Sequence, residues 1–241
     1  MFMRYLLSAA LLFACGPAFA QQKTVHFITP DGCRLEAFYL APSSGSYVFI
    51  NAHGLGSDKN EWGLLQKTLK SAGYGYLSLD LRGHGNSTVC GGKETKYMFF
   101  SEAGWNGVSL DIEAAAAWLK KRGLAPQKMV FCGASIGANL SLKAAVEGAL
   151  KPAALVLLSP GLEYAGVQTE NYFIAPRDFK VLSAAARNDS YAWNSVMRLN
   201  RAATEKGLPV YSLEAAGGHG VNMFKTPSII PAILSWVSEL K

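Results

Sequence analysis

A serine between two glycines is the residue in this chain best suited to covalent chemistry. It lies in Gly133-Ala134-Ser135-Ile136-Gly137, between an apolar run at 129–132 and a helical pattern at 136–149. A strand that turns directly into a helix strains the central residue, and glycine on either side avoids the clashes that a Cβ would cause. The turn presents the hydroxyl beside a helix N-terminus, which favours negative charge. Ser135 is therefore the candidate nucleophile.

A serine hydroxyl needs a general base, and the base needs an acid that orients it. For this kind of turn the expected chain order is serine, acid, histidine. His219 is the only histidine after Ser135, and it lies in the segment Ala216-Gly217-Gly218-His219-Gly220, just beyond the last predicted strand. The motif around Ser135 is weak alone, since roughly 0.2 matches are expected by chance at this composition. A histidine at this place supports Ser135 as the nucleophile, with His219 as its base. The alternative is that His219 is an ordinary loop residue.

The acid is chosen by its place relative to the predicted sheet. Asp189 follows the strand expected at 179–184, so its carboxylate leaves the sheet at the edge where Ser135 must also lie. Glu163, after the sixth strand, is the reserve acid. The other candidates, which we rank lower, are Glu170, Asp178 at the opposite end of that strand, and Glu214 at the surface. Asp189 as a plain turn residue is the alternative.

Two backbone N–H groups are needed to hold the negative charge that develops on a carbonyl oxygen during attack. The first is expected from Ile136, the residue after the nucleophile. The second is expected from Leu55, in the loop His53-Gly54-Leu55-Gly56 that follows an apolar run. His53 precedes the serine, which breaks the expected order, so we assign it a structural role in this loop.

These residues have to be positioned by a sheet, and the pattern of the chain predicts one. Short runs rich in β-branched and aromatic residues alternate with helical patterns, which indicates an α/β fold with a mostly parallel sheet and helices on both faces. Eight strands are expected, at 24–29, 34–41, 47–51, 76–79, 129–132, 154–158, 179–184 and 210–213. Helices are expected at 61–72, 111–121, 136–149 and 228–240, and 91–104 is expected to be a loop or short hairpin.

The first twenty residues have the pattern of a secretory signal peptide. Arg4 precedes the apolar run 5–14, which is too short to span a membrane, and Ala18-Phe19-Ala20 offers small residues to a signal peptidase. We predict cleavage after Ala20, a single domain over 21–241, and a periplasmic or extracellular location without stable membrane insertion. A lipoprotein anchored at Cys15 is the minor alternative, because Phe13 fits a lipobox poorly.

Charge and cysteine content exclude several other classes of function. The chain of 241 residues has a net charge of +6, and its basic residues are scattered, which argues against a nucleic-acid partner. Cys33, Cys90 and Cys132 remain after the signal, too few for a disulfide framework and without the spacing of a metal site. Because three cysteines are an odd number, we expect one disulfide and one buried thiol. We expect no cofactor and no metal.

Three motifs in order resemble the α/β-hydrolase family, and the resemblance covers nearly the whole mature chain. They are the loop 53–56, the segment Asp80-Leu81-Arg82-Gly83-His84-Gly85-Asn86-Ser87, and the motif 133–137. The family implies an eight-stranded sheet with an antiparallel second strand, and bracing roles for Asp80, Arg82 and His84. It also implies that Cys33 and Cys90 lie close enough for a disulfide, with Cys132 reduced and buried.

The resemblance also bears on access to the site. Family members often have a cap domain after the sixth strand, but only about twenty residues follow Ser159 here before the next strand, so we expect no sizeable cap and an open site. Aromatic residues could line its walls or simply pack. They are Tyr97, Phe99, Phe100 and Trp105 on one side and Tyr164, Tyr172 and Phe173 on the other.

Together these features predict a serine hydrolase that cleaves small carboxylic esters through an acyl-enzyme. Ser135 attacks, His219 carries the proton, Asp189 orients His219, and Leu55 and Ile136 hold the oxyanion. The same residues suit a small serine peptidase or aminopeptidase, or an acyltransferase. A non-catalytic binding protein with a hydrolase-like fold is the alternative from a different class. The natural substrate and the oligomeric state do not follow from the sequence.

Overall fold

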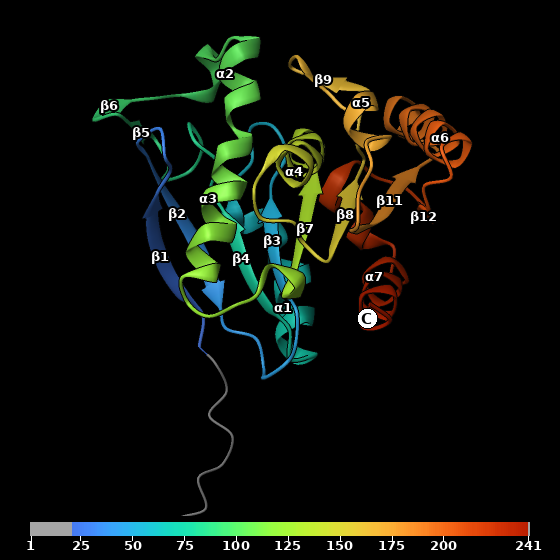
Figure 1. Ribbon diagram of the computed structural model, residues 1–241, viewed down its shortest axis with the longest axis horizontal. Helices are drawn as coiled ribbons and strands as arrows, with labels where there is room; N and C mark the ends of the chain where they lie inside the picture. The colour runs from blue at the N-terminus through green and yellow to red at the C-terminus, as the bar shows by residue number, and fades with distance from the viewer. Residues whose placement is uncertain (1–20, 241) are drawn as a thin grey trace, which may run out of the picture.

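A twisted β-sheet runs through the molecule, and most of its strands are parallel (Figure 1). The computed structural model describes residues 21–240, so the predicted signal peptide lies outside the described residues. The strands of the sheet are β1 (Lys23–Ile28), β2 (Cys33–Leu40), β3 (Val48–Ala52), β4 (Gly75–Leu79), β5 (Val89–Cys90), β6 (Lys93–Glu94), β7 (Met129–Ala134), β8 (Ala154–Leu158), β11 (Lys180–Ala186) and β12 (Tyr211–Ala215).

The strand order is β12-β11-β8-β7-β3-β4-β2-β5-β6, with β1 paired to β2. All pairs from β4 to β12 are parallel, and β2 is antiparallel to β1, β4 and β5. The eight predicted strands and the antiparallel second strand are thus confirmed. The sheet has ten strands rather than eight, because the two-residue strands β5 and β6 extend one edge, where Cys90 pairs with Cys33.

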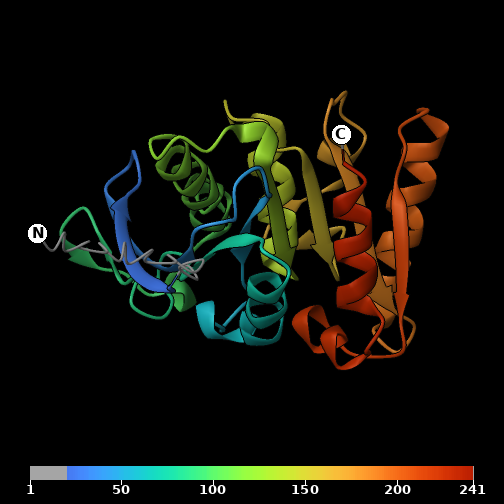
Figure 2. The same cartoon turned by 90° about the horizontal axis from the view of Figure 1, so that it is seen from below.

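Helices cover both faces of the sheet, as predicted (Figures 1 and 2). One hydrophobic core packs the sheet against α3 and α4, and the other packs it against α1 and α7. The helices are α1 (Gly63–Ser71), α2 (Glu102–Gly107), α3 (Ser109–Lys120), α4 (Ile136–Glu147), α5 (Glu170–Phe173), α6 (Ser190–Glu205) and α7 (Ile229–Ser238), with the 3₁₀ turns η1 (Lys59–Trp62), η2 (Tyr97–Phe99), η3 (Pro126–Lys128) and η4 (Gly220–Lys225).

The segment between β8 and β11 is short, which confirms that there is no sizeable cap. It holds a small hairpin of β9 (Glu163–Tyr164) and β10 (Val167–Gln168), followed by α5. In Figure 1 this hairpin lies above the carboxyl ends of β7 and β8. No helix within residues 21–240 is long and apolar enough to cross a membrane.

A disulfide joins Cys33 to Cys90, as the resemblance implied. The two residues are directly opposite each other in the β2–β5 pair, and this pairing brings their side chains together. Cys132 is a free, buried thiol in β7. The bridge therefore fastens the edge of the sheet, away from the strands that lead to Ser135.

Candidate active site

Ser135 lies at the tight turn between β7 and α4, at the carboxyl edge of the sheet. Its backbone has φ 55° and ψ −124°, a left-handed conformation that is strained for any residue with a Cβ. The turn is closely packed, because a Cβ on Gly133 would overlap the carbonyl oxygen of Gly137, and a Cβ on Gly137 would overlap that of Ala52. Ser135 is 9% exposed, so the turn presents it at the floor of a cavity.

The structure brings Asp189 and His219 together from two neighbouring strand ends. Asp189 follows β11 and immediately precedes α6, and His219 follows β12 and precedes η4. The His219 Nδ1 lies 2.6 Å from the Asp189 Oδ2. The carboxylate accepts a hydrogen bond from the Nδ1–H group, which fixes the tautomer and leaves Nε2 free to take a proton. His219 and Ser135 line the same cavity.

Asp189 is the only acidic residue within 21–240 whose carboxylate bonds to His219. Glu170 forms an ion pair with Arg198, and Glu214 forms one with Arg187. Asp178 precedes β11 at the surface, as predicted, and Glu163 has an exposed carboxylate. The geometry thus favours Asp189 over the reserve acid Glu163.

The loop after β3 lies directly beside the nucleophile. A Cβ on Gly54 would be 3.6 Å from the Ser135 Cβ. The Gly54 N–H donates to the Glu61 Oε1 at 3.0 Å, whereas the N–H groups of Leu55 and Ile136 have no acceptor among residues 21–240. Leu55 lines the same cavity as Ser135, and Ile136 follows Ser135 in the chain, so these two donors are available near the nucleophile.

His53 holds this loop from beneath, which agrees with its assigned structural role. Its Nδ1 donates to the Gly54 carbonyl at 2.8 Å, and its Nε2 accepts from the Leu81 N–H at 3.0 Å. Burial, together with the neighbouring His84, lowers the pKa of His53 to about 3. The imidazole is thus neutral and joins two loops of the site.

A network of buried charges braces the next loop. The Asp80 carboxylate accepts from the Lys59 ammonium at 2.6 Å and from the N–H groups of Lys59 and Asn86. The Arg82 guanidinium binds the buried Asp111 carboxylate at 2.7 Å. His84 stacks on Tyr97 with their ring centroids 4.0 Å apart. These contacts match the bracing roles implied for Asp80, Arg82 and His84.

Most of the aromatic residues proposed as pocket walls pack elsewhere. Phe173 is buried, the Tyr172 hydroxyl lies between Lys143 and Glu147, and Phe99 points into solvent. Phe100 and Trp105 pack on each other, and Tyr97 lies behind Gly56. Tyr164 alone contacts the site, because its ring meets that of His219 edge to face. For Tyr97, Phe100 and Trp105 the structure therefore favours packing, the second of the two alternatives.

The cavity in front of Ser135 has a volume of about 300 Å³. Glu61, which the sequence did not single out, lies in its wall beside Ser57 and Asn222. Burial raises the pKa of Glu61, and hydrogen bonds from Ser57 and Gly54 oppose the rise. One wall of the cavity therefore holds a carboxylate with no cationic side chain bound to it among residues 21–240.

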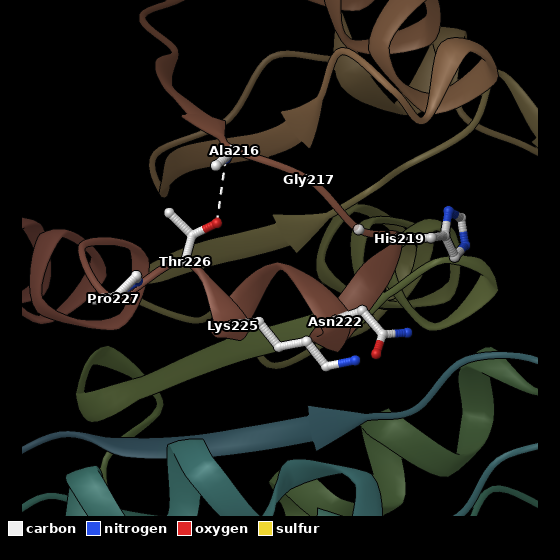
Figure 3. A pocket seen from close by; sticks show the side chains of 8 residues that line it. Ala216, Gly217, His219, Asn222, Lys225, Thr226 and Pro227 are labelled. Carbon is white, nitrogen blue, oxygen red and sulfur yellow. Dashed lines mark hydrogen bonds between the residues drawn. The ribbon is translucent and has the colours of Figure 1, made fainter.

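A second hollow of about 610 Å³ continues on the other side of His219 (Figure 3). It lies between the backbone of 216–218 and η4, and it shares His219 and Asn222 with the first cavity. Figure 3 shows Asn222 and Lys225 extending from the same side of η4. The Thr226 hydroxyl accepts from the Ala216 N–H at 3.2 Å, and this bond joins the two sides of the hollow. The two hollows together form an open groove. Among residues 21–240, no group of side chains is arranged to hold a metal ion.

A sheet of this order, with a serine after β7 and an acid–histidine pair after β11 and β12, defines an α/β hydrolase. The sequence model of the serine aminopeptidase S33 family matches residues 44–207, more than half of the chain. The chain therefore belongs to this family. A comparison of the sequence with curated proteins finds no match.

Similar solved structures share the fold at low sequence identity. The Pyrococcus furiosus esterase Pf2001 is 18% identical with a TM-score of 0.74, and the match covers 92% of this chain and 91% of that one. A dienelactone hydrolase from Anabaena variabilis is 19% identical with a TM-score of 0.64, over 92% and 97% of the two chains. An acylaminoacyl peptidase from Pyrococcus horikoshii is 14% identical with a TM-score of 0.72, over 93% of this chain and 42% of that one.

Proposed function

We propose that this hydrolase cleaves carboxylic esters through a covalent acyl-enzyme on Ser135. The observation that carries the proposal is the Asp189–His219 hydrogen bond at the rim of the cavity whose floor is Ser135. A carboxylate-bound imidazole in the same cavity as a strained serine is the combination of residues that makes a serine hydroxyl nucleophilic.

In the proposed mechanism, the His219 Nε2 takes the Ser135 proton as Oγ attacks the ester carbonyl carbon. The carbonyl π electrons move to oxygen, and the N–H groups of Leu55 and Ile136 stabilise the oxyanion. The carbonyl re-forms, the bond to the alcohol oxygen breaks, and His219 gives its proton to that oxygen. Water then repeats the sequence on the acyl-enzyme and releases the acid. Asp189 stays ionised and holds the imidazolium.

The second candidate is cleavage of aminoacyl amides, and Glu61 is the observation that favours it. A carboxylate in the wall of the cavity can bind a substrate ammonium group, which a neutral ester lacks. The family name includes aminopeptidases, and the fold is shared with both an esterase and an acylaminoacyl peptidase. We rank esters first because one carboxylate, already bonded to Gly54, is a weak anchor for an amine.

Replacement of the nucleophile tests the proposal directly. Ser135→Ala is expected to lower the turnover of short p-nitrophenyl esters on the order of a million-fold, because no other hydroxyl replaces the nucleophile. Ser235→Ala, a change of an exposed serine on α7, is the matched control and is expected to keep full activity. Activity retained in folded, pure Ser135→Ala would refute the assignment.

A substrate panel decides between the two candidates. Esters of increasing acyl length, aryl esters and aminoacyl amides are compared by kcat/KM with the wild-type protein. Faster cleavage of neutral esters supports the first candidate. Faster cleavage of amides with a free amine, abolished by Glu61→Gln, would support the second.

We also propose that the chain is exported after cleavage at Ala20. The N-terminal pattern of Arg4, an apolar run and Ala18-Phe19-Ala20 supports this. Expression of the full chain in a bacterium, followed by N-terminal sequencing of the exported protein, tests it. A mature protein starting at Gln21 is expected, whereas a lipid-modified Cys15 at the N-terminus would favour the anchored form.

A further inference from the structure

The small hairpin after β8 is fastened to the body of the protein at several points. Its turn, Ala165-Gly166, has φ values of 49° and 79°, so Ala165 adopts a conformation that a residue with a Cβ rarely takes. The Thr169 hydroxyl donates to the Gly161 carbonyl at 2.7 Å, and the Gly161 N–H donates to the Asn139 Oδ1 at 3.1 Å. A strained turn held by buried hydrogen bonds indicates that the position of this hairpin matters.

A second set of bonds fixes the strand that contains Tyr164. The Tyr191 hydroxyl donates to the Glu163 carbonyl at 2.8 Å and accepts from the Glu163 N–H at 3.1 Å. The rings of Tyr164 and Tyr191 meet edge to face with centroids 5.5 Å apart. A Cβ on Gly161 would overlap both rings, so this glycine makes room for them. Tyr164 therefore has little freedom to move its ring.

The Tyr164 side chain lies against His219. Its ring lies edge to face with that of His219, with centroids 6.2 Å apart, and its hydroxyl donates to the Ser159 carbonyl at 3.3 Å. Ser159 follows β8, and the Ser135 N–H donates to the carbonyl of Leu158, the residue before it, so this hydroxyl lies at the strand end beside the turn that holds Ser135. Burial raises the pKa of Tyr164, so the phenol keeps its proton and is a hydrogen-bond donor at neutral pH.

The strand order fixes the side of Ser135 on which this donor lies. Ser135 follows β7, which lies between β3 and β8. The loop with the Leu55 N–H follows β3, and Tyr164 follows β8, so the two donors flank the nucleophile from opposite sides. The carbonyl oxygen turns toward Leu55 and Ile136. Tyr164 lies on the other side, where its ring contacts His219, and this is the side on which His219 would pass its proton to the leaving group.

We propose that Tyr164 is a further catalytic residue, whose hydroxyl donates a hydrogen bond to the leaving-group oxygen. This inference rests on the proposed ester hydrolysis at Ser135. The hydroxyl releases the long bond to Ser159 and binds the alcohol oxygen as its bond to the carbonyl carbon breaks. The electron pair of that bond goes to the alcohol oxygen, and the proton that this oxygen gains comes from His219. Tyr164 keeps its own proton throughout.

The benefit of such a donor depends on the leaving group. An alkoxide oxygen gathers much more negative charge in the transition state than a p-nitrophenolate oxygen, which spreads its charge over the ring. Hydrogen bonds to charged acceptors are about twice as strong as those to neutral ones. Loss of the hydroxyl is therefore expected to lower kcat/KM roughly 10-fold or more for an alkyl ester, and less than about 3-fold for the p-nitrophenyl ester.

Tyr164→Phe tests the proposal, because it removes the hydroxyl and keeps the ring against His219. The kcat/KM is measured for the p-nitrophenyl, phenyl and ethyl esters of acetic acid. Each preparation is normalised by its burst of p-nitrophenol, which counts the functional sites even if part of the variant is misfolded. Tyr172→Phe is the matched control, because its hydroxyl binds Lys143 and Glu147 on the surface of α4.

The expected result is a steeper fall of kcat/KM with leaving-group basicity in Tyr164→Phe than in wild type and Tyr172→Phe. An equal loss for all three esters, or no loss, would overturn the role on the leaving group, because a structural defect slows every ester alike. These outcomes differ from failure of the proposed function. In that case the wild-type protein cleaves none of the esters, or Ser135→Ala cleaves them as well as wild type does.

Discussion

The disulfide between Cys33 and Cys90 makes a quantitative prediction about stability. The two residues are 57 positions apart in the chain. Closing a loop of this length in the unfolded chain removes entropy that corresponds to about 4 kcal/mol at room temperature. Folded domains are stable by roughly 5–15 kcal/mol, so the bridge supplies a large part of the total. We expect the double variant Cys33→Ser/Cys90→Ser to unfold roughly 8–16 °C below the wild type.

The assay is denaturation of four samples, the wild type and the double variant, each with and without a thiol reductant. Reductant is expected to lower the unfolding midpoint of the wild type toward that of the double variant and to leave the double variant unchanged. This second comparison separates the cross-link from any packing effect of serine at the two positions. Equal midpoints for oxidised wild type and the double variant would refute the reasoning.

Two further predictions concern the acids of the site. Asp189→Asn is expected to lower kcat on the order of ten-thousand-fold, because an amide can hold His219 in the wrong tautomer, whereas Glu163→Gln keeps nearly full activity. Similar losses in the two variants would contradict the choice of Asp189. Burial raises the pKa of Glu61, so its ionisation in the folded protein lowers stability as the pH rises through the folded pKa. Glu61→Gln still accepts from Gly54, so we expect a higher unfolding midpoint than wild type at pH 7 and a gap that closes as the pH falls to about 4. If the difference in unfolding midpoint between Glu61→Gln and wild type does not change with pH, the ionisation of Glu61 is not its cause.

The long elements of the fold could be predicted from the sequence, and the short ones could not. Runs such as 154–158 are continuously apolar because both faces of a parallel strand are covered, and this pattern is visible without a structure. The two-residue strands β5 and β6 have no periodicity to detect, and β5 forms because Cys90 pairs with Cys33 across the sheet. The helix α6 was not among the predicted elements, although its Val196, Leu199 and Ala203 form a buried stripe.

Some residues of the site could likewise be predicted from the sequence, and others could not. Ser135, Asp189 and His219 each follow a strand, so the rule that parallel strands end at one edge places them together before any coordinates are known. Glu61 follows no strand, and its place beside Ser135 depends on how η1 folds back under the loop 53–56. Tyr164 could not be separated from ordinary aromatic packing until its contact with His219 was visible. Residues brought in by short turns are therefore the ones that sequence patterns miss.

The exposure of the site bears on whether water or another alcohol completes the reaction. An acyltransferase must keep water away from its acyl-enzyme, which requires a cap or a closed groove around the base. Here the His219 side chain is 45% exposed and the segment between β8 and β11 adds only a small hairpin. In the proposed acyl-enzyme, water can therefore reach the ester bond from the side of His219, its proposed base. The open groove that follows from the missing cap therefore supports the proposal of hydrolysis over acyl transfer.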